Sequence, residues 1–454
     1  MTGGVEVTSD PGNQAAGHHP GGQAVGRRWD AERLGNRRAV EALRSGVPNA
    51  DAVTALGSGQ ADIEDRFAAL LADVADPHTA RRGRASMLLG GGFGQGKSHL
   101  LTHLGHLART AGFVVSTVVI SKETPLYDPV KVLRAAVESA VDPAGGRDVV
   151  TEAADALDPD NPGYAELIRW LRGPGRDLNE RFEATLLLHQ RLTQATAPAG
   201  EEDFLVSIGR FWSGDTLRMP ELRRQLTAIG EAKSFTFAPI NLPDLARQRL
   251  RFLPRLLRAA GHAGWVILFD EVELIGRYSL LQRGRSYAEL ARWLDGDPTD
   301  STGGPDVREP LVAVAAMTDD FETAVLVGKN DRVDLAARLR NKETLEYAEI
   351  AARAEDAMTH IERDLLTLVP PDTTELDHAY STLRQLHGAA YDWDPPDVPG
   401  LERLGATRMR QYVRAWINEW DLVRLDPDYQ PITDAIDTAA DYREHPELGS
   451  DDTA

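Results

Sequence analysis

Four short runs of consecutive apolar residues stand out along the chain, at 86–90, 113–120, 265–269 and 311–317. Runs that are apolar throughout, without alternating polar positions, are typical of strands buried on both faces of a parallel sheet. Helical patterns lie between and after these runs. The pattern therefore predicts an α/β protein with a parallel sheet.

The stretch between the second and third runs, 121–264, is too long for a single crossover connection and contains several helical patterns broken by Pro and Gly. We expect a helical insertion there, within a core at 28–345. Residues 346–432 look all-helical and predict a C-terminal lid domain. The ends, 1–27 and 433–454, are expected to be a disordered tail and an acidic tail.

Composition narrows the class of protein. The 454 residues are 42% hydrophobic, enough for two or three domains, and the formal net charge is −20. This charge argues against bulk attraction to nucleic acid but leaves a local basic groove open. There are no cysteines, which excludes disulfides and thiolate metal sites. Because no run reaches the roughly 18 apolar residues of a membrane span, we expect a cytoplasmic protein without membrane contact.

The first apolar run leads into a glycine-rich stretch that ends in Gly96-Lys97-Ser98. With Gly91 it fits the phosphate-binding pattern G-x-x-x-x-G-K-[ST], and a predicted helix at 97–111 follows. Backbone N–H groups of such a loop surround nucleotide phosphates, the lysine neutralises their charge and the serine binds Mg²⁺. The expected nucleotide-binding residues are Gly91, Gly92, Phe93, Gly94, Gln95, Gly96, Lys97, Ser98 and His99.

The third apolar run ends in two adjacent acids, Asp270 and Glu271. At the end of a buried strand, Asp270 is expected to hold Mg²⁺ together with Ser98, and Glu271 to orient and polarise the attacking water. Glu273 is interpreted as an ordinary acid at a helix start. Together with the glycine-rich loop, this pair predicts ATP hydrolysis.

The fourth run ends in Thr318-Asp319-Asp320. In AAA+ ATPases the corresponding strand carries a polar residue that positions the lytic water. Thr318 fits that place, with Asp319 as the competing residue. An ordinary strand end with the acids as a helix cap fits equally well.

Several stretches together resemble a known family: RRAVEALRSGVPNADAVTALGSGQADIEDRF (37–67), GGGFGQGKSHLL, VVISKETPLYDPVKV (118–132), ILFDEVELI (267–275) and TRMRQYVRAWINEWDL (407–422). They are similar to the ATP-binding proteins of bacterial BREX-type phage-exclusion systems, the BrxD-like group. That group looks like a branch of the origin-recognition-type AAA+ ATPases. The resemblance implies an ATPase using ATP and Mg²⁺ beside other defence-system proteins, such as a helicase or modification enzyme, with DNA left open as a partner.

The resemblance also implies roles for residues outside the two motifs. Arg408, in Gly405-Ala406-Thr407-Arg408, matches a lid arginine that reaches the γ-phosphate of its own subunit, and Val47 and Pro48 lie where adenine is approached. In an AAA+ ring, an arginine of the next subunit completes the site. Arg338 is favoured here, with Arg340 and Arg332 as alternatives, so a homo-oligomer is expected with ATP.

Two features separate the chain from initiator proteins of that class. Too little chain follows residue 430 for a winged-helix DNA-binding domain, and the substitute could be the five arginines at 246–258. These face a phosphate backbone or an acidic partner, or they belong to a core helix with solvated stems. A remodelling ATPase leads the functional hypotheses. A low-turnover ATP-dependent switch or scaffold is the alternative, and a P-loop kinase fits the acid pair less well.

Overall fold

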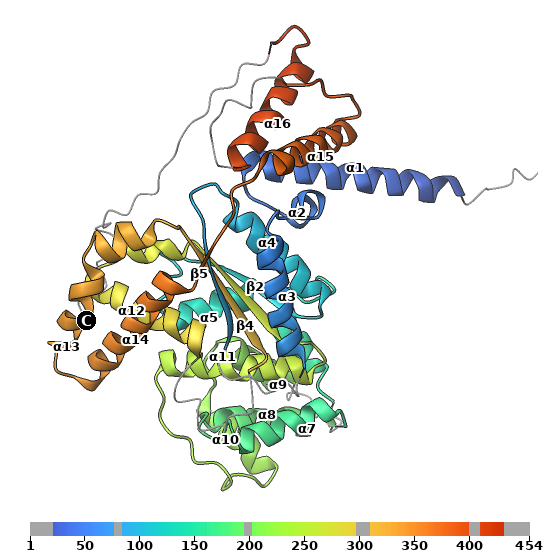
Figure 1. Cartoon of the computed structure of the whole chain (residues 1–454). Helices are drawn as coiled ribbons and strands as arrows, with labels where there is room; N and C mark the ends of the chain where they lie inside the picture. Colours follow the sequence, from blue (N-terminus) through green and yellow to red (C-terminus); the bar gives the residue numbers. More distant parts are fainter. Residues whose placement is uncertain are drawn as a thin grey trace, which may run out of the picture.

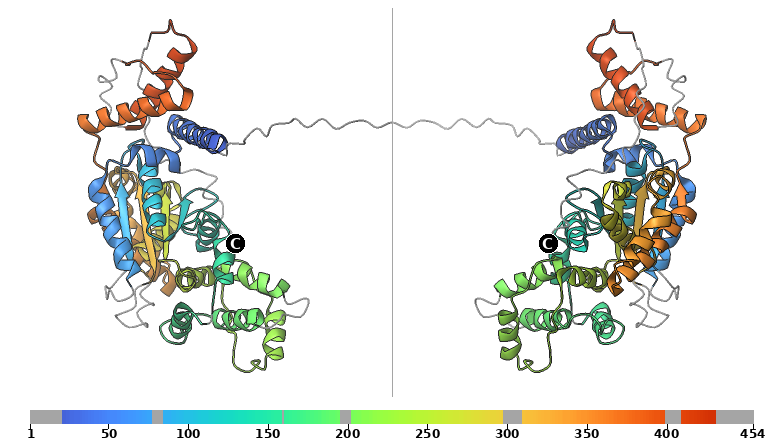
Figure 2. Two further views of the ribbon diagram at one scale, coloured as in Figure 1. Left: turned by 90° about the vertical axis from the view of Figure 1, so that its right-hand side faces the viewer. Right: turned by 90° about the vertical axis from the view of Figure 1, so that its left-hand side faces the viewer.

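The structure is a computed structural model of the whole chain, and it describes residues 21–76, 84–158, 160–194, 202–296, 309–398 and 409–430. Figure 1 shows a sheet in the middle, with one group of helices at each end. Figure 2 shows the same arrangement from both sides.

The sheet has five strands in the order β2-β3-β4-β1-β5, and every neighbouring pair is parallel. Four of the strands confirm the apolar runs read from the sequence. The fifth was not predicted, because three residues are too few to give a periodic signal. The strands are β1 (Ala85–Gly90), β2 (Val114–Val119), β3 (Trp265–Asp270), β4 (Leu311–Met317) and β5 (Leu365–Thr367).

Successive side chains of each strand enter two different cores, one on each face of the sheet. On one face, Met87, Val266 and Val314 pack with α3 (Ala61–Ala75) and α4 (Lys97–Thr110). On the other face, Ile267 and Ala313 pack with the remaining helices of the sheet unit. Both faces are covered, which explains why the strands are apolar throughout.

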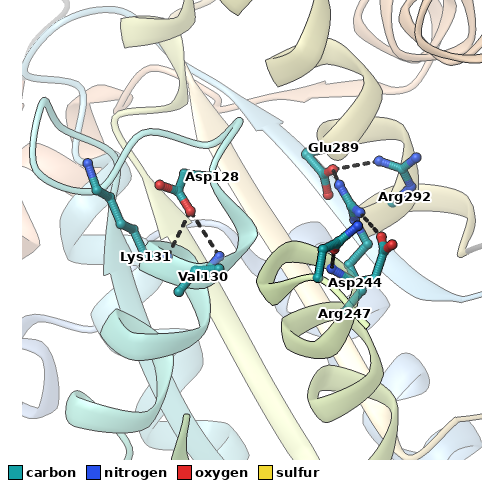
Figure 3. Close-up of polar contacts among 8 residues, drawn as sticks. Asp128, Val130, Lys131, Asp244, Arg247, Glu289 and Arg292 are labelled. Carbon is teal, nitrogen blue, oxygen red and sulfur yellow. Dashed lines mark hydrogen bonds and ion pairs between the residues drawn. The ribbon is translucent and has the colours of Figure 1, made fainter. Parts of the chain in front are cut away.

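Between β2 and β3 the described residues form seven helices, as the length of this stretch suggests. The first and last, α5 and α11, pack against each other, and α5 also packs on β2. Asp128 caps α5 by accepting hydrogen bonds from the backbone of Val130 and Lys131 (Figure 3). The helices are α5 (Pro129–Glu138), α6 (Val149–Asp155), α7 (Pro162–Arg172), α8 (Arg181–Gln194), α9 (Glu202–Ser213), α10 (Met219–Ala228) and α11 (Leu242–Ala259).

After β3 the chain stays in the sheet unit longer than the sequence suggests. Helix α14 packs against α12, and β5 pairs with β1. The sheet unit therefore extends to residue 367, whereas the expected lid begins at 346. The elements are η1 (Val272–Arg277), α12 (Leu280–Asp295), η3 (Glu322–Val327), η4 (Asp331–Leu335), α13 (Ala336–Arg340) and α14 (Leu345–Arg363).

A second unit, here called the helical unit, combines both ends of the described chain (Figure 1). It consists of α1 (Gly21–Ser45), α2 (Ala50–Leu56), α15 (Thr373–Tyr391) and α16 (Met409–Leu425). Val40, Leu383 and Trp420 lie in its core. Two expectations change: residues 21–27 are helical, not part of a disordered tail, and α1 and α2 pack with the C-terminal helices.

The arginines at 246–258 are held inside the molecule. Arg247 forms ion pairs with Asp244 and Glu289, and Arg292 binds the same Glu289 (Figure 3). Arg249 is buried and donates hydrogen bonds to the carbonyls of Phe211 and Asp215. The other three contact Asp177, the ring of Trp170 and the carbonyl of Ala263. The view of these arginines as a free surface for a phosphate backbone is therefore wrong.

Candidate nucleotide-binding site

The glycine-rich loop connects β1 to α4 and lies against the ends of two neighbouring strands. Its first N–H, that of Gly91, donates to the carbonyl of Met317 at the end of β4. Gly94 and Gly96 have φ angles of +82° and +104°, which only glycine adopts without strain. Helix α4 then begins at Lys97, so its unpaired N–H groups and partial positive charge point into the loop.

Two side chains fold over this loop. Lys97 is buried and donates hydrogen bonds to the carbonyls of Gly91 and Gly92, at 2.8 and 3.4 Å. The side-chain oxygen of Gln95 accepts a 2.6 Å hydrogen bond from the N–H of Gly92. The loop therefore concentrates donors and one buried cation, which is the arrangement that binds phosphate groups.

The two acids at the end of β3 occupy different environments. Asp270 is buried at the strand end, and its carboxylate accepts a hydrogen bond from the N–H of Glu271. Glu271 has a left-handed backbone, with φ of +59°, which is uncommon for a residue with a side chain. Burial and the neighbouring Asp270 raise the pKa of Glu271. A carboxylate with raised proton affinity is suited to take a proton from water.

Glu273 is more important than the sequence suggests. Only 5% of it is exposed, its Oε1 lies 3.8 Å from Lys97 Nζ, and its Oε2 has no hydrogen-bond partner among the described residues. Burial raises the pKa of Glu273 to about 7, although Lys97 opposes the shift. It is therefore a buried acid facing the loop lysine. No sequence signal marks it, because the contact depends on the turn of η1.

The end of β4 lies between the ends of β1 and β3, since β4 pairs with both strands. Thr318 follows this strand directly and is buried, whereas Asp319 and Asp320 are exposed. The order of the strands thus brings Thr318 between the glycine-rich loop and the acid pair. Burial favours Thr318 over Asp319 for a role in the site.

A cavity of about 660 Å³ lies where the sheet unit meets the helical unit, and its volume is within the range of small-molecule sites. The glycine-rich loop from Phe93 to Gly96, the start of α4 and Glu271 line it from the sheet unit. Leu43, Pro48 and Val413 line it from the helical unit. Asp270 and Thr318 lie at the adjoining strand ends and are not among its lining residues. The residue types fit a ligand with both charged and apolar parts.

Polar side chains of α3 and α4 support the cavity wall at residues 57–60. The ring of His99 bonds the carbonyl of Gly57 at 2.6 Å, and burial lowers the pKa of His99, so the neutral ring donates this bond. Ser58 donates to Glu64, which also contacts His103 at 3.2 Å. His99 was expected in the site from its place after Ser98, whereas His103 and Glu64 were not.

The helical unit contributes an arginine that the sequence did not single out. Arg410 lines the cavity, its Nη2 donates to the carbonyl of Gly46 at 2.6 Å, and its backbone N–H approaches the carbonyl of Gly94 at 3.4 Å. Its charge acts on the pKa of Glu271. Arg408 lies outside the described residues. Pro48 lines the cavity, while Val47 does not and is 68% exposed.

The remaining predicted residue, Arg338, lies on α13, away from the cavity of its own chain. Its side chain is 62% exposed and pairs with Asp334 at 3.3 Å within the same helical segment. Arg332 and Arg340 pair with Glu362 and Glu355. Arg338 therefore does not belong to the site formed within a single chain.

The parallel five-stranded sheet, with helices on both faces and a glycine-rich loop after its first strand, is compatible with a P-loop nucleoside triphosphatase. Residues 33–141 match the family model described as "BREX system ATP-binding protein BrxC/D". The match includes α2, the glycine-rich loop and β2, and confirms the resemblance to the BREX ATP-binding proteins. No curated protein and no solved structure matches the chain significantly. In the described part of the chain, no helix has the length and hydrophobicity needed to cross a bilayer.

Proposed function

We propose that the protein is an AAA+ ATPase of a BREX-like antiphage system that binds ATP with Mg²⁺ and uses hydrolysis to assemble or remodel a defence complex on DNA. One observation carries the proposal: Lys97, Ser98 and Glu271 line one cavity at the ends of β1 and β3. The family match over residues 33–141 supports the ligand and the system. Cytoplasmic location and partnership with a helicase or modification enzyme follow from that system.

The chain's residues divide the chemistry among them. The N–H groups of residues 91–98 and Lys97 hold the phosphates, and Glu271 takes a proton from the attacking water. Ser98 and Asp270 offer the hydroxyl and carboxylate oxygens that fit Mg²⁺, which would neutralise phosphate charge when bound. Thr318 orients the water from the end of β4. Arg410, or Arg408 from the segment before it, contacts the terminal phosphate from the helical unit.

The γ-phosphate site is completed in trans under this proposal. Arg338 is exposed on α13, and its only partner within the described residues is an exposed acid of its own helical segment. A second copy therefore meets an arginine that is free to change partners. The alternative function is a low-turnover switch or scaffold, which requires the same loop but little hydrolysis.

Turnover measurements separate these functions. Glu271→Gln should retain ATP while turnover falls by roughly 10² or more, the effect of losing a general base. Lys97→Ala, the binding control, should lose ATP affinity by calorimetry. Mixing Glu271→Gln with Arg338→Ala should restore part of the activity, because some interfaces then pair an intact Glu271 with an intact Arg338. Mixing Glu271→Gln with Arg410→Ala should restore none. Wild-type turnover that stays negligible with DNA present would favour the switch.

A further inference from the structure

Within the described residues, the chain crosses twice between the sheet unit and the helical unit. The first connector, residues 57–60, leads from α2 to α3, and the second, residues 368–372, leads from β5 to α15. Both connectors line the cavity, through Gly57 to Gln60 on one side and Leu368, Val369 and Pro371 on the other. Any movement of one unit against the other therefore passes through the wall of the cavity.

A single side chain joins the two connectors. The amide of Gln60 donates from Nε2 to the carbonyl of Val369 at 2.9 Å, and its Oε1 accepts from the N–H of Val369 at 2.9 Å. The glutamine side chain thus pairs with a peptide group of the second connector as a neighbouring β-strand would. Residues more than 300 positions apart in the sequence are held at a fixed separation.

The two connectors differ in stiffness. Gly57 and Gly59 have φ angles of +65° and +66°, so the first connector bends where glycine allows it. The second contains Pro370 and Pro371, whose rings fix the backbone. It is also anchored to the end of β1 by a 2.7 Å hydrogen bond from Leu368 N–H to the carbonyl of Gly90. Gln60 therefore ties a pliant connector to a rigid one.

The first connector is also fixed to the sheet unit. His99 bonds the carbonyl of Gly57, and the N–H of Gln60 donates to Ser58 Oγ at 3.0 Å. The fixed end of the connector thus lies beside the start of α4, and its glycines lead toward the helical unit. The pairing of Gln60 with Val369 sets how far apart these two walls stand.

We propose that Gln60 is a positioning residue for the bound nucleotide: its amide pins the two connectors and sets the width of the cavity between the units. The inference rests on the proposed function, ATP binding in this cavity. Gln60 lies outside the phosphate loop and the acid pair, so its loss should weaken ATP binding without slowing the chemical step.

The test uses the full chain and two substitutions. Gln60→Ala removes both hydrogen bonds, and Gln60→Glu keeps the size but loses the donor to Val369. Each should raise the KM for ATP about tenfold, the effect of one or two lost neutral hydrogen bonds, while kcat stays within about twofold. Gln385→Ala, at an exposed position of α15, is the matched control and should leave both constants unchanged. Gln60→Glu with the wild-type KM would overturn the inference.

A distance measurement tests the pin without nucleotide. The chain has no cysteine, so Glu138→Cys on α5 and Ser381→Cys on α15 introduce the only labelling sites for paired spin labels. Gln60→Ala should broaden the distance distribution between the units, and Gln385→Ala should not. An unchanged distribution would overturn the pin while leaving ATP binding standing. A wild-type chain that binds no ATP would instead overturn the proposed function.

Discussion

Glu273 lies three residues beyond Asp270, buried against Lys97, and its ionised form is unfavourable in the folded protein. Burial raises its pKa from the ordinary 4.5 to about 7, even though Lys97 Nζ lies 3.8 Å from Oε1. Each tenfold change in proton affinity is worth about 1.4 kcal/mol, so this rise corresponds to about 3 kcal/mol. The substitution Glu273→Gln replaces the carboxylate by a neutral amide of the same shape and removes that cost.

The pH dependence gives the sign. An acid whose pKa is raised by folding holds its proton more tightly in the folded state, so ionisation destabilises the fold as pH rises from 4.5 to about 7. Below pH 4.5 both states are protonated and the variant should match the wild type. Above pH 7 the variant should be more stable by up to about 3 kcal/mol.

The assay is urea unfolding at pH 5 and pH 8, without nucleotide or Mg²⁺. Glu322→Gln, at an exposed position of η3, is the matched control and should leave the difference between the two pH values unchanged. A Glu273→Gln chain that is less stable at pH 8, or equally shifted at both pH values, would refute the reasoning. A carboxylate retained at such a cost beside the loop lysine is characteristic of a functional site.

Two further predictions concern the helical unit and the far side of the sheet. Arg410→Ala should lower ATP turnover by roughly 10², the scale of losing one donor to transition-state charge, whereas Arg414→Ala, exposed on the same helix, should leave it unchanged; equal effects would exclude a direct role for Arg410. Burial alone would lower the pKa of His360, but hydrogen bonds to Asp364 and Asp295 raise it overall. Its stabilising effect is therefore complete below about pH 6.5 and lost as pH rises through the raised pKa, so His360→Asn should lower the melting temperature more at pH 6 than at pH 9.

The local parts of the site could be predicted because each depends on a short continuous segment. A phosphate loop needs glycines, a lysine and a hydroxyl between a strand and a helix, and residues 86–111 contain all of them. The acid pair directly follows an apolar run. Such segments define their own geometry through backbone angles and the helix start, so the loop and the ends of β3 and β4 are found without knowledge of distant contacts.

The parts missed depend on contacts between distant segments. Val40 of α1 packs with Leu383 of α15, and no local pattern announces that the first helix completes a C-terminal unit. Arg410 and Gln60 each make their contacts across more than 300 positions of sequence. The arginines of α11 were ambiguous because the amphipathic pattern places them outside one core. The insertion then encloses that face, and their hydrogen bonds are satisfied internally.

One buried ion pair connects the two groups that the proposal assigns to neighbouring sites. Arg283 donates two hydrogen bonds to Asp331, both 2.8 Å long, and a third to the carbonyl of Tyr278. Asp331 begins η4, which leads directly to α13 and Arg338, while Tyr278 follows η1 and Glu271. Removing charges from water is expensive, so such a pair is weak evidence for stability alone.

Its geometry gives it a different use under the proposed function. The turn that carries Glu271 toward the chain's own nucleotide is fixed to the helical segment that offers Arg338 to a neighbour's nucleotide. Tyr287 adds a third hydrogen bond to Asp331 at 3.0 Å, so the carboxylate is held in one orientation. Because close-packed interiors shift between discrete arrangements, a change at Glu271 reaches α13 through this cluster. In this way a single chain can link the state of its own site to the arginine that completes the next one.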